Sequence, residues 1–269
     1  MGFSSANAQV SLHDFEKVIE VLVGPSRWQD HIVANLPKAR ANSGKPLFQI
    51  LNSKEYEKIL SEQDKKDASH LAGITKKKDG KIYMQDFIGQ NKGAARLGHV
   101  LHEAVHWVSD PAGKSANGNS TARLMLGTGL FEGLVEAVTE DILQAQGIAL
   151  ASPEKRGHRA RVAMFRCLCR IMENRNQPRA AVAFFGSILF RGDLTHNNVL
   201  REMVWTFTDL EWPRIMQLAS DNKQDAAIAT MKRAAAKQEA IHDQEDAAIR
   251  EHFARLRRLE TNYMPGVMK

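Results

Sequence analysis

Apolar and polar residues follow two different periods along this chain of 269 residues. Near the N-terminus, short apolar runs are separated by turn residues, which is typical of strands and short helices. From residue 91 onward, apolar residues recur every three to four positions, as they do along one face of a helix. The pattern therefore predicts an α+β part followed by a mostly α-helical part.

The first part carries the strand signals of the chain. Apolar runs bounded by turn residues or caps predict two helices, at residues 11–22 and 54–63, and three strands, at 46–51, 70–75 and 81–88. Asp79-Gly80 joins the last two strands, and this dipeptide is typical of a β-hairpin. The alternation within 81–88 predicts an exposed or edge strand. The polar stretch between the first helix and the first strand carries no predicted element.

The second part is predicted to contain seven helices, at residues 92–109, 129–147, 157–174, 178–190, 196–206, 209–219 and 222–260. The last of these is longer than an ordinary globular helix and is rich in Ala, Glu, Lys, Gln and Arg. Its apolar residues only approximate a heptad, because Gln238 interrupts it. We expect a helix that packs on the rest of the chain, and dimerisation or partner docking through it is the alternative.

These patterns divide the chain into three segments. We expect residues 1–120 to form an α+β subdomain with a small sheet or hairpin, 121–220 to form a helical subdomain, and 221–269 to form the long C-terminal helix. Cys167 and Cys169 lie two residues apart in a predicted helix, so their side chains point to different faces. We expect them to be free, buried thiols.

Composition supports a globular protein with a large core, since 43% of the residues are hydrophobic and 25% are charged. The N-terminus lacks the basic and apolar regions of a secretory signal, and no apolar run is long enough to span a membrane. We therefore expect a cytoplasmic protein, or one exported by a route that needs no signal peptide, as bacterial effectors and toxin domains are.

The net charge of +6 permits a nucleic-acid partner without requiring one. The basic clusters lack the interleaved aromatic residues on which bases stack. Nucleic acid is therefore a possible partner but not the expected one.

His102-Glu103-Ala104-Val105-His106 is the sharpest chemical signal in the sequence. Residues four apart on a helix share a face, so both imidazoles can bind one metal ion. Glu103 lies on the rim of that face, where it can hold a zinc-bound water and act as general base. The apolar residues of the predicted helix at 92–109 would hold the His pair on a buried scaffold. The motif predicts a zinc site on this helix.

A catalytic zinc site needs a third protein ligand, and the predicted helix at 129–147 offers carboxylates. Glu132, Glu136 and Glu140 recur every four residues, so they lie on one face of that helix. Gly133 would let the helix approach a neighbour closely. The strand at 81–88 directly precedes the His helix and, as an edge strand, could align an extended peptide along the metal.

With these two helices, the sequence resembles the gluzincin metallopeptidases, in which a His-Glu-x-x-His helix is followed by a helix whose Glu completes the zinc site. The resemblance covers about residues 70–145, and the segments Phe184-Phe185-Gly186 and Gly192-Asp193 are also similar to bacterial gluzincin-like domains. It implies a zincin-like fold, with Glu132 as the third ligand beside His102 and His106 and with Glu136 orienting the first His. Glu103 would then be the general base of a zinc metalloendopeptidase.

The sequence departs from the gluzincin pattern in two places. His106 and Glu132 have 25 residues between them, which implies an inserted loop at 109–128. No Gly-x-Met-x-Asn segment precedes the His motif. We therefore expect an endopeptidase rather than a true aminopeptidase.

Several roles have more than one candidate. Asp110, four residues after His106, competes with Glu136 to orient a zinc-binding His. His196 and Tyr83 are both candidates to stabilise the oxyanion. Two other functions remain open. One is a catalytically inactive metallopeptidase-like binding protein, and the other is a DNA-associated zinc protease, which the net positive charge suggests.

Overall fold

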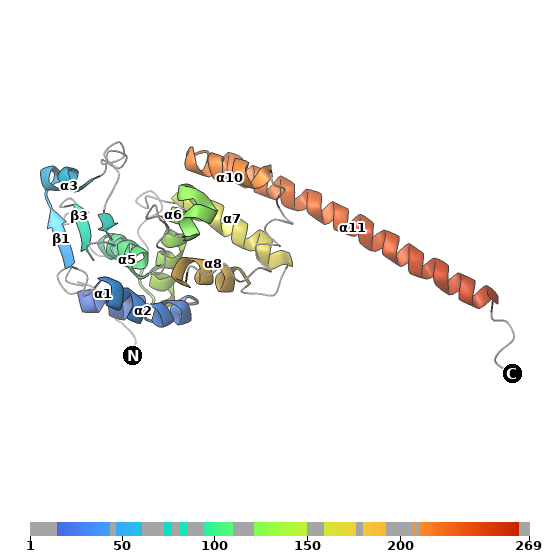
Figure 1. The fold of residues 1–269 in the computed structure, drawn as a ribbon, viewed down its shortest axis with the longest axis horizontal. Coiled ribbons are helices and arrows are strands. Elements are labelled where there is room, and N and C mark those ends of the chain that lie inside the picture. Colours follow the sequence, from blue (N-terminus) through green and yellow to red (C-terminus); the bar gives the residue numbers. More distant parts are fainter. Residues whose placement is uncertain are drawn as a thin grey trace.

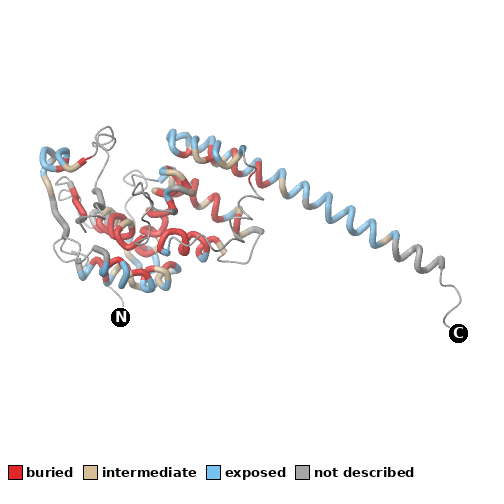
Figure 2. The backbone as a smooth tube through the Cα atoms, viewed as in Figure 1, coloured by how far each residue is buried: buried red, intermediate tan, exposed pale blue. Residues whose placement is uncertain are grey.

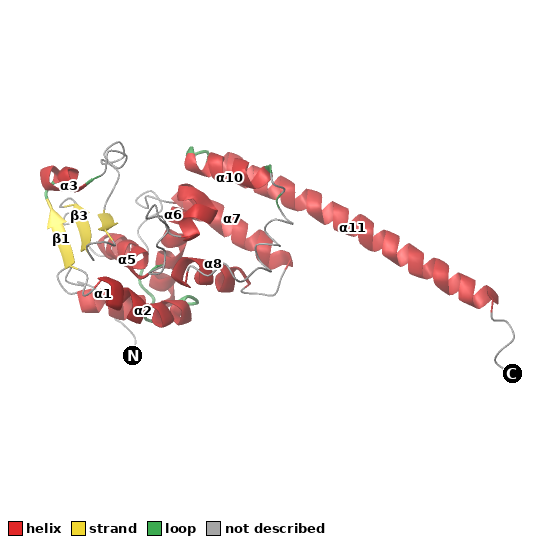
Figure 3. Cartoon of the chain, in the orientation of Figure 1, coloured by secondary structure: helices red, strands yellow, loops and turns green. Residues whose placement is uncertain are grey.

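The structure is a computed structural model, and it describes residues 15–43, 47–60, 73–76, 81–85, 94–109, 121–149, 159–175, 180–191, 207 and 210–263. The described chain is mostly helical, as predicted, with a three-stranded sheet at one end (Figures 1 and 3). Its helices are α1 (Phe15–Leu22), α2 (Gln29–Ser43), α3 (Ser53–Ile59), α5 (Ala94–Val108), α6 (Thr121–Ala145), α7 (Arg159–Arg175), α8 (Ala180–Arg191), α10 (Glu211–Ser220) and α11 (Gln224–Tyr263). Its strands are β1 (Leu47–Leu51), β2 (Gly73–Lys76) and β3 (Lys81–Gln85). The predicted helix at 196–206 lies outside the described residues.

The sheet has the strand order β1-β3-β2, with β3 parallel to β1 and antiparallel to β2. The predicted pairing of β2 with β3 is therefore confirmed. The prediction that β3 is an exposed or edge strand is wrong, because β1 pairs along its other side. Ile82 and Met84 are fully buried and Tyr83 nearly so, which means that both faces of β3 are covered. Within the described sheet, β2 is an edge strand instead.

A capping box begins α3 at Ser53, one residue before the predicted start. The Glu55 backbone N–H donates to Asn52 Oδ1 at 3.0 Å, and the Asn52 N–H donates to Glu55 Oε2 at 3.2 Å. These two bonds satisfy backbone donors that a helix start leaves without partners. The helix is shorter than predicted, since Leu60 is already extended.

Helix α2 occupies the polar stretch in which no element was predicted. The residues buried by α2 and by the turn before it are spaced as on one helix face: Trp28, Ile32, Asn35 and Ala39. Asn35 interrupts this stripe, and Pro37 lies inside the helix, so the apolar period is weak in the sequence. Asn35 has a structural task, because its Nδ2–H donates to the Val108 carbonyl at the end of α5 at 2.6 Å. Helix α2 therefore anchors the helix that bears the His motif.

Helix α6 begins at Thr121, earlier than predicted, and breaks at Gly127, whose φ of 66° and ψ of 167° are not helical. A positive φ of this size favours glycine. The predicted inserted loop at 109–128 is therefore wrong for 121–126, which are helical, while 110–120 lie outside the described residues. The break separates a short first segment of α6 from the longer segment that carries the glutamates.

One hydrophobic core joins all three predicted segments of the chain, from Val18 in α1 to Ala234 in α11 (Figure 2). A smaller cluster of Tyr56, Leu60 and Tyr83 lies between α3 and the sheet. Among the described helices, none combines the length and the apolar character that crossing a bilayer requires.

The two cysteines of α7, Cys167 and Cys169, are free and buried, as predicted. Burial raises the pKa of the Cys169 thiol to about 12, despite the nearby Arg27. A thiol with such a pKa has almost no thiolate near neutral pH, which makes it unreactive.

Two glycines allow the longer segment of α6 to approach its neighbours closely. A Cβ on Gly133 would overlap with the carbonyl oxygen of Arg161 in α7, and a Cβ on Gly129 would overlap with that of Ala219 in α10. The close approach predicted for Gly133 is therefore confirmed.

Replacing Gly133 with Ala should destabilise the protein, because the new Cβ would force α6 and α7 apart. We expect the free energy of unfolding to fall by about 1–3 kcal/mol, as in other overpacked contacts, when it is measured by urea denaturation. The matched control is Gly98→Ala on α5, where a Cβ would make only an ordinary contact, 3.9 Å from Leu143. This control should be neutral or up to about 1 kcal/mol more stable, because Ala favours helix. Equal effects of the two substitutions would contradict the close packing of α6 on α7.

Candidate metal centre

Helix α5 holds the His motif on a buried scaffold. Its core-facing residues are Leu97, Val100, Leu101, Ala104, Val105 and Val108. The hydroxyl of Ser109 donates to the His106 carbonyl at 2.8 Å, and Asn35 bonds the Val108 carbonyl. These bonds satisfy carbonyls that the end of a helix leaves without partners. The last turn of α5, which contains His106, is therefore well anchored.

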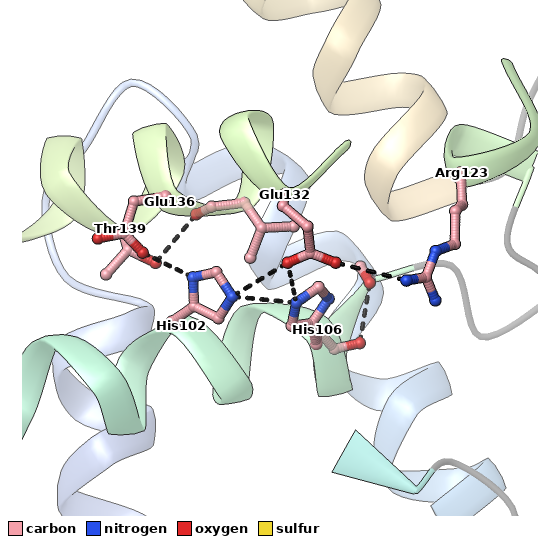
Figure 4. A network of polar contacts seen from close by, with 8 residues as sticks. His102, His106, Arg123, Glu132, Glu136 and Thr139 are labelled. Carbon is pink, nitrogen blue, oxygen red and sulfur yellow. Dashed lines mark hydrogen bonds and ion pairs between the residues drawn. The ribbon is translucent and has the colours of Figure 1, made fainter. Parts of the chain in front are cut away.

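Helix α6 packs against α5 and brings Glu132 and Glu136 to the His pair (Figure 4). Both glutamates are partly buried, and they lie one turn apart, as do His102 and His106. One turn of each helix therefore meets one turn of the other, and four polar side chains face each other across the contact.

Three ligand atoms converge between the two helices. Nε2 of His102 lies 3.1 Å from Nε2 of His106, and the latter lies 3.2 Å from Oε2 of Glu132. The third side of the triangle, from His102 Nε2 to Glu132 Oε2, is 3.4 Å. Among the described residues, these three form the group of His, Cys, Asp and Glu side chains that could hold a metal ion. The structure thus brings together the three residues that the sequence indicated as ligands.

The size and chemistry of this triangle fit a zinc ion. Two ligand atoms bound at the usual distances to one tetrahedral zinc lie about 3.3–3.4 Å apart. The three observed separations are within about 0.3 Å of that value. Two imidazoles and one carboxylate are also a donor set typical of catalytic zinc, in which the fourth position stays open.

Glu136 is hydrogen-bonded to the first histidine of the motif. Nδ1 of His102 donates its proton to Glu136 Oε2 at 2.7 Å. With Nδ1 protonated, the neutral ring has its lone pair on Nε2, which faces the other two ligand atoms. Glu136 therefore has the place that the sequence predicted, and it selects the tautomer that can bind a metal.

The charges of the site favour a cation at its centre. Burial opposes protonation of His102, but hydrogen bonds to Glu132 and Glu136, together with the charges of Glu136 and Glu103, raise its pKa well above the ordinary value. Burial alone would raise the pKa of Glu132, yet the two imidazoles hold it well below the ordinary value. These groups therefore stabilise positive charge between them. A divalent cation that displaced the proton of His102 would supply that charge.

Glu140, the third glutamate of α6, has different surroundings from Glu132 and Glu136. Glu140, one turn beyond Glu136, accepts a hydrogen bond from Arg166 Nη2 at 3.1 Å. The same guanidinium bonds the neighbouring Asp141 at 3.0 Å. Glu140 therefore joins α6 to α7 and does not belong to the metal centre.

Arg123 is a residue of the site that sequence reasoning missed. Its Nη2 lies 3.7 Å from Glu132 Oε1, the carboxylate oxygen directed away from the imidazoles, and its side chain is 43% exposed (Figure 4). The guanidinium carbon also lies 5.7 Å from the centre of the Phe131 ring. Arg123 belongs to the segment of α6 that was predicted to be loop, so the sequence carried no signal for its place. It supplies a partly exposed positive charge beside the third ligand.

Of the other predicted site residues, Tyr83 does not face the His pair. Tyr83 packs with Tyr56 and Leu60, whereas its strand neighbours Ile82 and Met84 join the main core that includes α5. Because successive side chains of a strand point to opposite faces, Tyr83 faces α3 and not the metal centre. Asp110 and His196 lie outside the described residues, so their predicted roles stay predictions.

No family model, no curated protein and no solved structure matches the chain. The case for a metal centre rests on the distances and hydrogen bonds described above.

Purified protein that has been loaded with zinc and then dialysed should retain about one zinc ion per chain, measured by atomic emission. His102→Ala removes one of three ligands and should weaken zinc binding by more than the roughly 10–100-fold typical of losing a partner that only orients a ligand. The matched control is His99→Ala, which removes a partly buried imidazole from the same helix and should keep the zinc. A folded wild-type protein that holds no zinc would contradict the assignment.

Glu136→Ala should reduce zinc affinity by about 10–100-fold without removing a ligand, because His102 loses the partner that sets its tautomer. Competition with a chromophoric chelator would measure the change. The matched control is Glu140→Gln on the next turn of α6, which weakens the contact with Arg166 and should leave zinc affinity unchanged. If both variants lost affinity alike, general loosening of α6 would explain the result and the orienting role of Glu136 would be wrong.

Proposed function

We propose that this protein is a zinc-dependent metalloendopeptidase with a zincin-like site of gluzincin type. The observation that carries the proposal is the triangle of His102 Nε2, His106 Nε2 and Glu132 Oε2, with sides of 3.1–3.4 Å. The hydrogen bond from His102 to Glu136 supports it, because ligating histidines in zinc enzymes usually donate their other N–H to such a partner.

Each of the surrounding residues then has a chemical task. Zinc, when bound by His102, His106 and Glu132, polarises a scissile carbonyl and lowers the pKa of water. Glu103 is buried next to His102, and its charge contributes to the raised pKa of that ring. We assign it as the general base, which takes a proton from the attacking water and passes it to the leaving amine.

Arg123 is suited to stabilise negative charge on a substrate. Its guanidinium lies beside Glu132 and is partly exposed, so a peptide carbonyl at the site would come within its field. Tyr83, which faces the other side of the sheet, is not suited to that task. His196 remains a second candidate for it.

The edge strand β2 is suited to align a peptide substrate. β2 packs against α5 and has a described partner strand on one side only, which is β3. A strand edge offers backbone N–H and C=O groups that can pair with an extended peptide. In this proposal, β2 takes the role that the sequence had suggested for β3.

Glu103→Gln should abolish cleavage of a peptide library while zinc content stays near that of the wild type, because the substitution removes the base and no ligand. We expect the rate to fall by about 10²–10⁴-fold, the usual contribution of general base catalysis. Glu57→Gln, an exposed change of the same kind on α3, is the matched control and should cleave normally. Undiminished cleavage by Glu103→Gln would assign the base to another residue.

Two measurements, peptide cleavage by zinc-loaded wild type and binding to duplex DNA, separate the alternative functions. A wild-type protein that holds zinc but cleaves no peptide of the library would favour the catalytically inactive binding protein. Binding to duplex DNA that weakens steeply with salt, together with cleavage, would favour the DNA-associated protease.

A further inference from the structure

Beyond its first turns, α11 extends away from the body of the protein as a helical arm, residues 236–263 (Figures 1 and 2). At a rise of 1.5 Å per residue, the arm is about 42 Å long. Among the residues from 236 to 255 whose side chains the structure describes, none is buried. Helices in water normally depend on packing for most of their stability, so an arm of this length calls for a partner.

The face of α11 that packs on the body continues along the arm. The first turns of α11 bury Ala227, Met231 and Ala234 next to α7 and α10. The same spacing of three and four residues leads on through Gln238, Ile241 and Glu245 to Ala248, so polar and apolar residues alternate on this line in the arm. Next to this line, Ile249 and Phe253 are 53% and 55% exposed. The arm thus carries exposed apolar residues on and beside this line, which Gln238 and Glu245 interrupt.

The exposed large apolar residues of the described chain are concentrated in the arm. The structure has five large hydrophobic side chains that are exposed in its described part, and three of them belong to the arm: Ile241, Ile249 and Phe253. Single exposed apolar residues are common on protein surfaces, but several along one helix face indicate an interaction surface.

The arm also carries two blocks of opposite charge. Residues 239–246 contain Glu239, Asp243, Glu245 and Asp246 and no Lys or Arg. Residues 250–258 contain four arginines and a single acidic residue, Glu251. The boundary between the blocks lies near Ala248, which is close to the middle of the arm.

We propose that the arm pairs with the arm of a second copy of this chain in antiparallel orientation, with the twofold axis near Ala248. In this orientation the acidic block of each copy lies alongside the basic block of the other. A parallel pair in register would instead set acidic against acidic and basic against basic. Because the axis is near the middle, the arms overlap over almost their whole length and the two bodies lie at opposite ends.

The mass of the full-length protein in solution tests the pairing. Multi-angle light scattering should give about twice the chain mass of 30.1 kDa. One variant changes the four acidic residues of 239–246 to Lys, and a second changes the four arginines of 250–258 to Glu. Each should be a monomer by itself because its own blocks then repel, whereas an equimolar mixture of the two should form a dimer again. A monomeric wild type, or dimers of either variant alone, would overturn the proposal.

Disulfide trapping tests the orientation. Ala248→Cys lies at the proposed axis and should crosslink to its copy under mild oxidation. Gln238→Cys is the matched control on the same line, since two such residues in an antiparallel pair lie about 30 Å apart along the helices and should not crosslink. Crosslinking at both positions would show a parallel pair and overturn the antiparallel arrangement. Circular dichroism and zinc content check that each variant is folded.

Discussion

The structure depends on bringing three electron-rich atoms, two imidazole nitrogens and a carboxylate oxygen, within 3.4 Å of one another. Lone pairs so close repel each other unless a proton or a cation lies between them, so the surrounding fold must hold them there. Asn35 and Ser109 anchor the end of α5, and Gly133 lets α6 pack tightly against α7 on its other side. Two rigid helices can therefore maintain a geometry that isolated side chains would avoid.

The glutamates of α6 show how tertiary packing divides one repeated residue type among different tasks. Glu132 and Glu136 face α5, where one joins the ligand triangle and the other accepts the Nδ1 proton of His102. Glu140 faces α7 and pairs with Arg166, which also bonds Asp141. Asp141 in turn accepts a hydrogen bond from Trp28 at 2.8 Å, which connects the last turns of α6 to the N-terminal part of the chain. A buried carboxylate needs a partner, and these carboxylates have theirs on two different helices, the histidines of α5 and Arg166 of α7.

Most helices were predictable because their apolar residues recur with the helical period, and α3 because Asn52 and Glu55 form a local capping box. The errors have equally physical causes. Helix α2 escaped prediction because Asn35 takes a buried position in its stripe in order to bond a carbonyl of α5. The interior place of β3 depends on β1, a strand distant in the chain that no pattern within β3 reveals. The first segment of α6 ends at Gly127, and a glycine in the sequence does not show whether it breaks a helix or lies outside one.

The sequence by itself determined the ligand types and their spacing, because two histidines four residues apart share a helix face whatever surrounds them. It also determined that Glu132, Glu136 and Glu140 lie on one face of a second helix. Only the tertiary structure decided which of these carboxylates meets the histidines, that Arg123 stands beside Glu132, and that Tyr83 faces the opposite side of the sheet. Spacing within one helix follows from local backbone geometry, whereas contacts between elements depend on how distant segments pack.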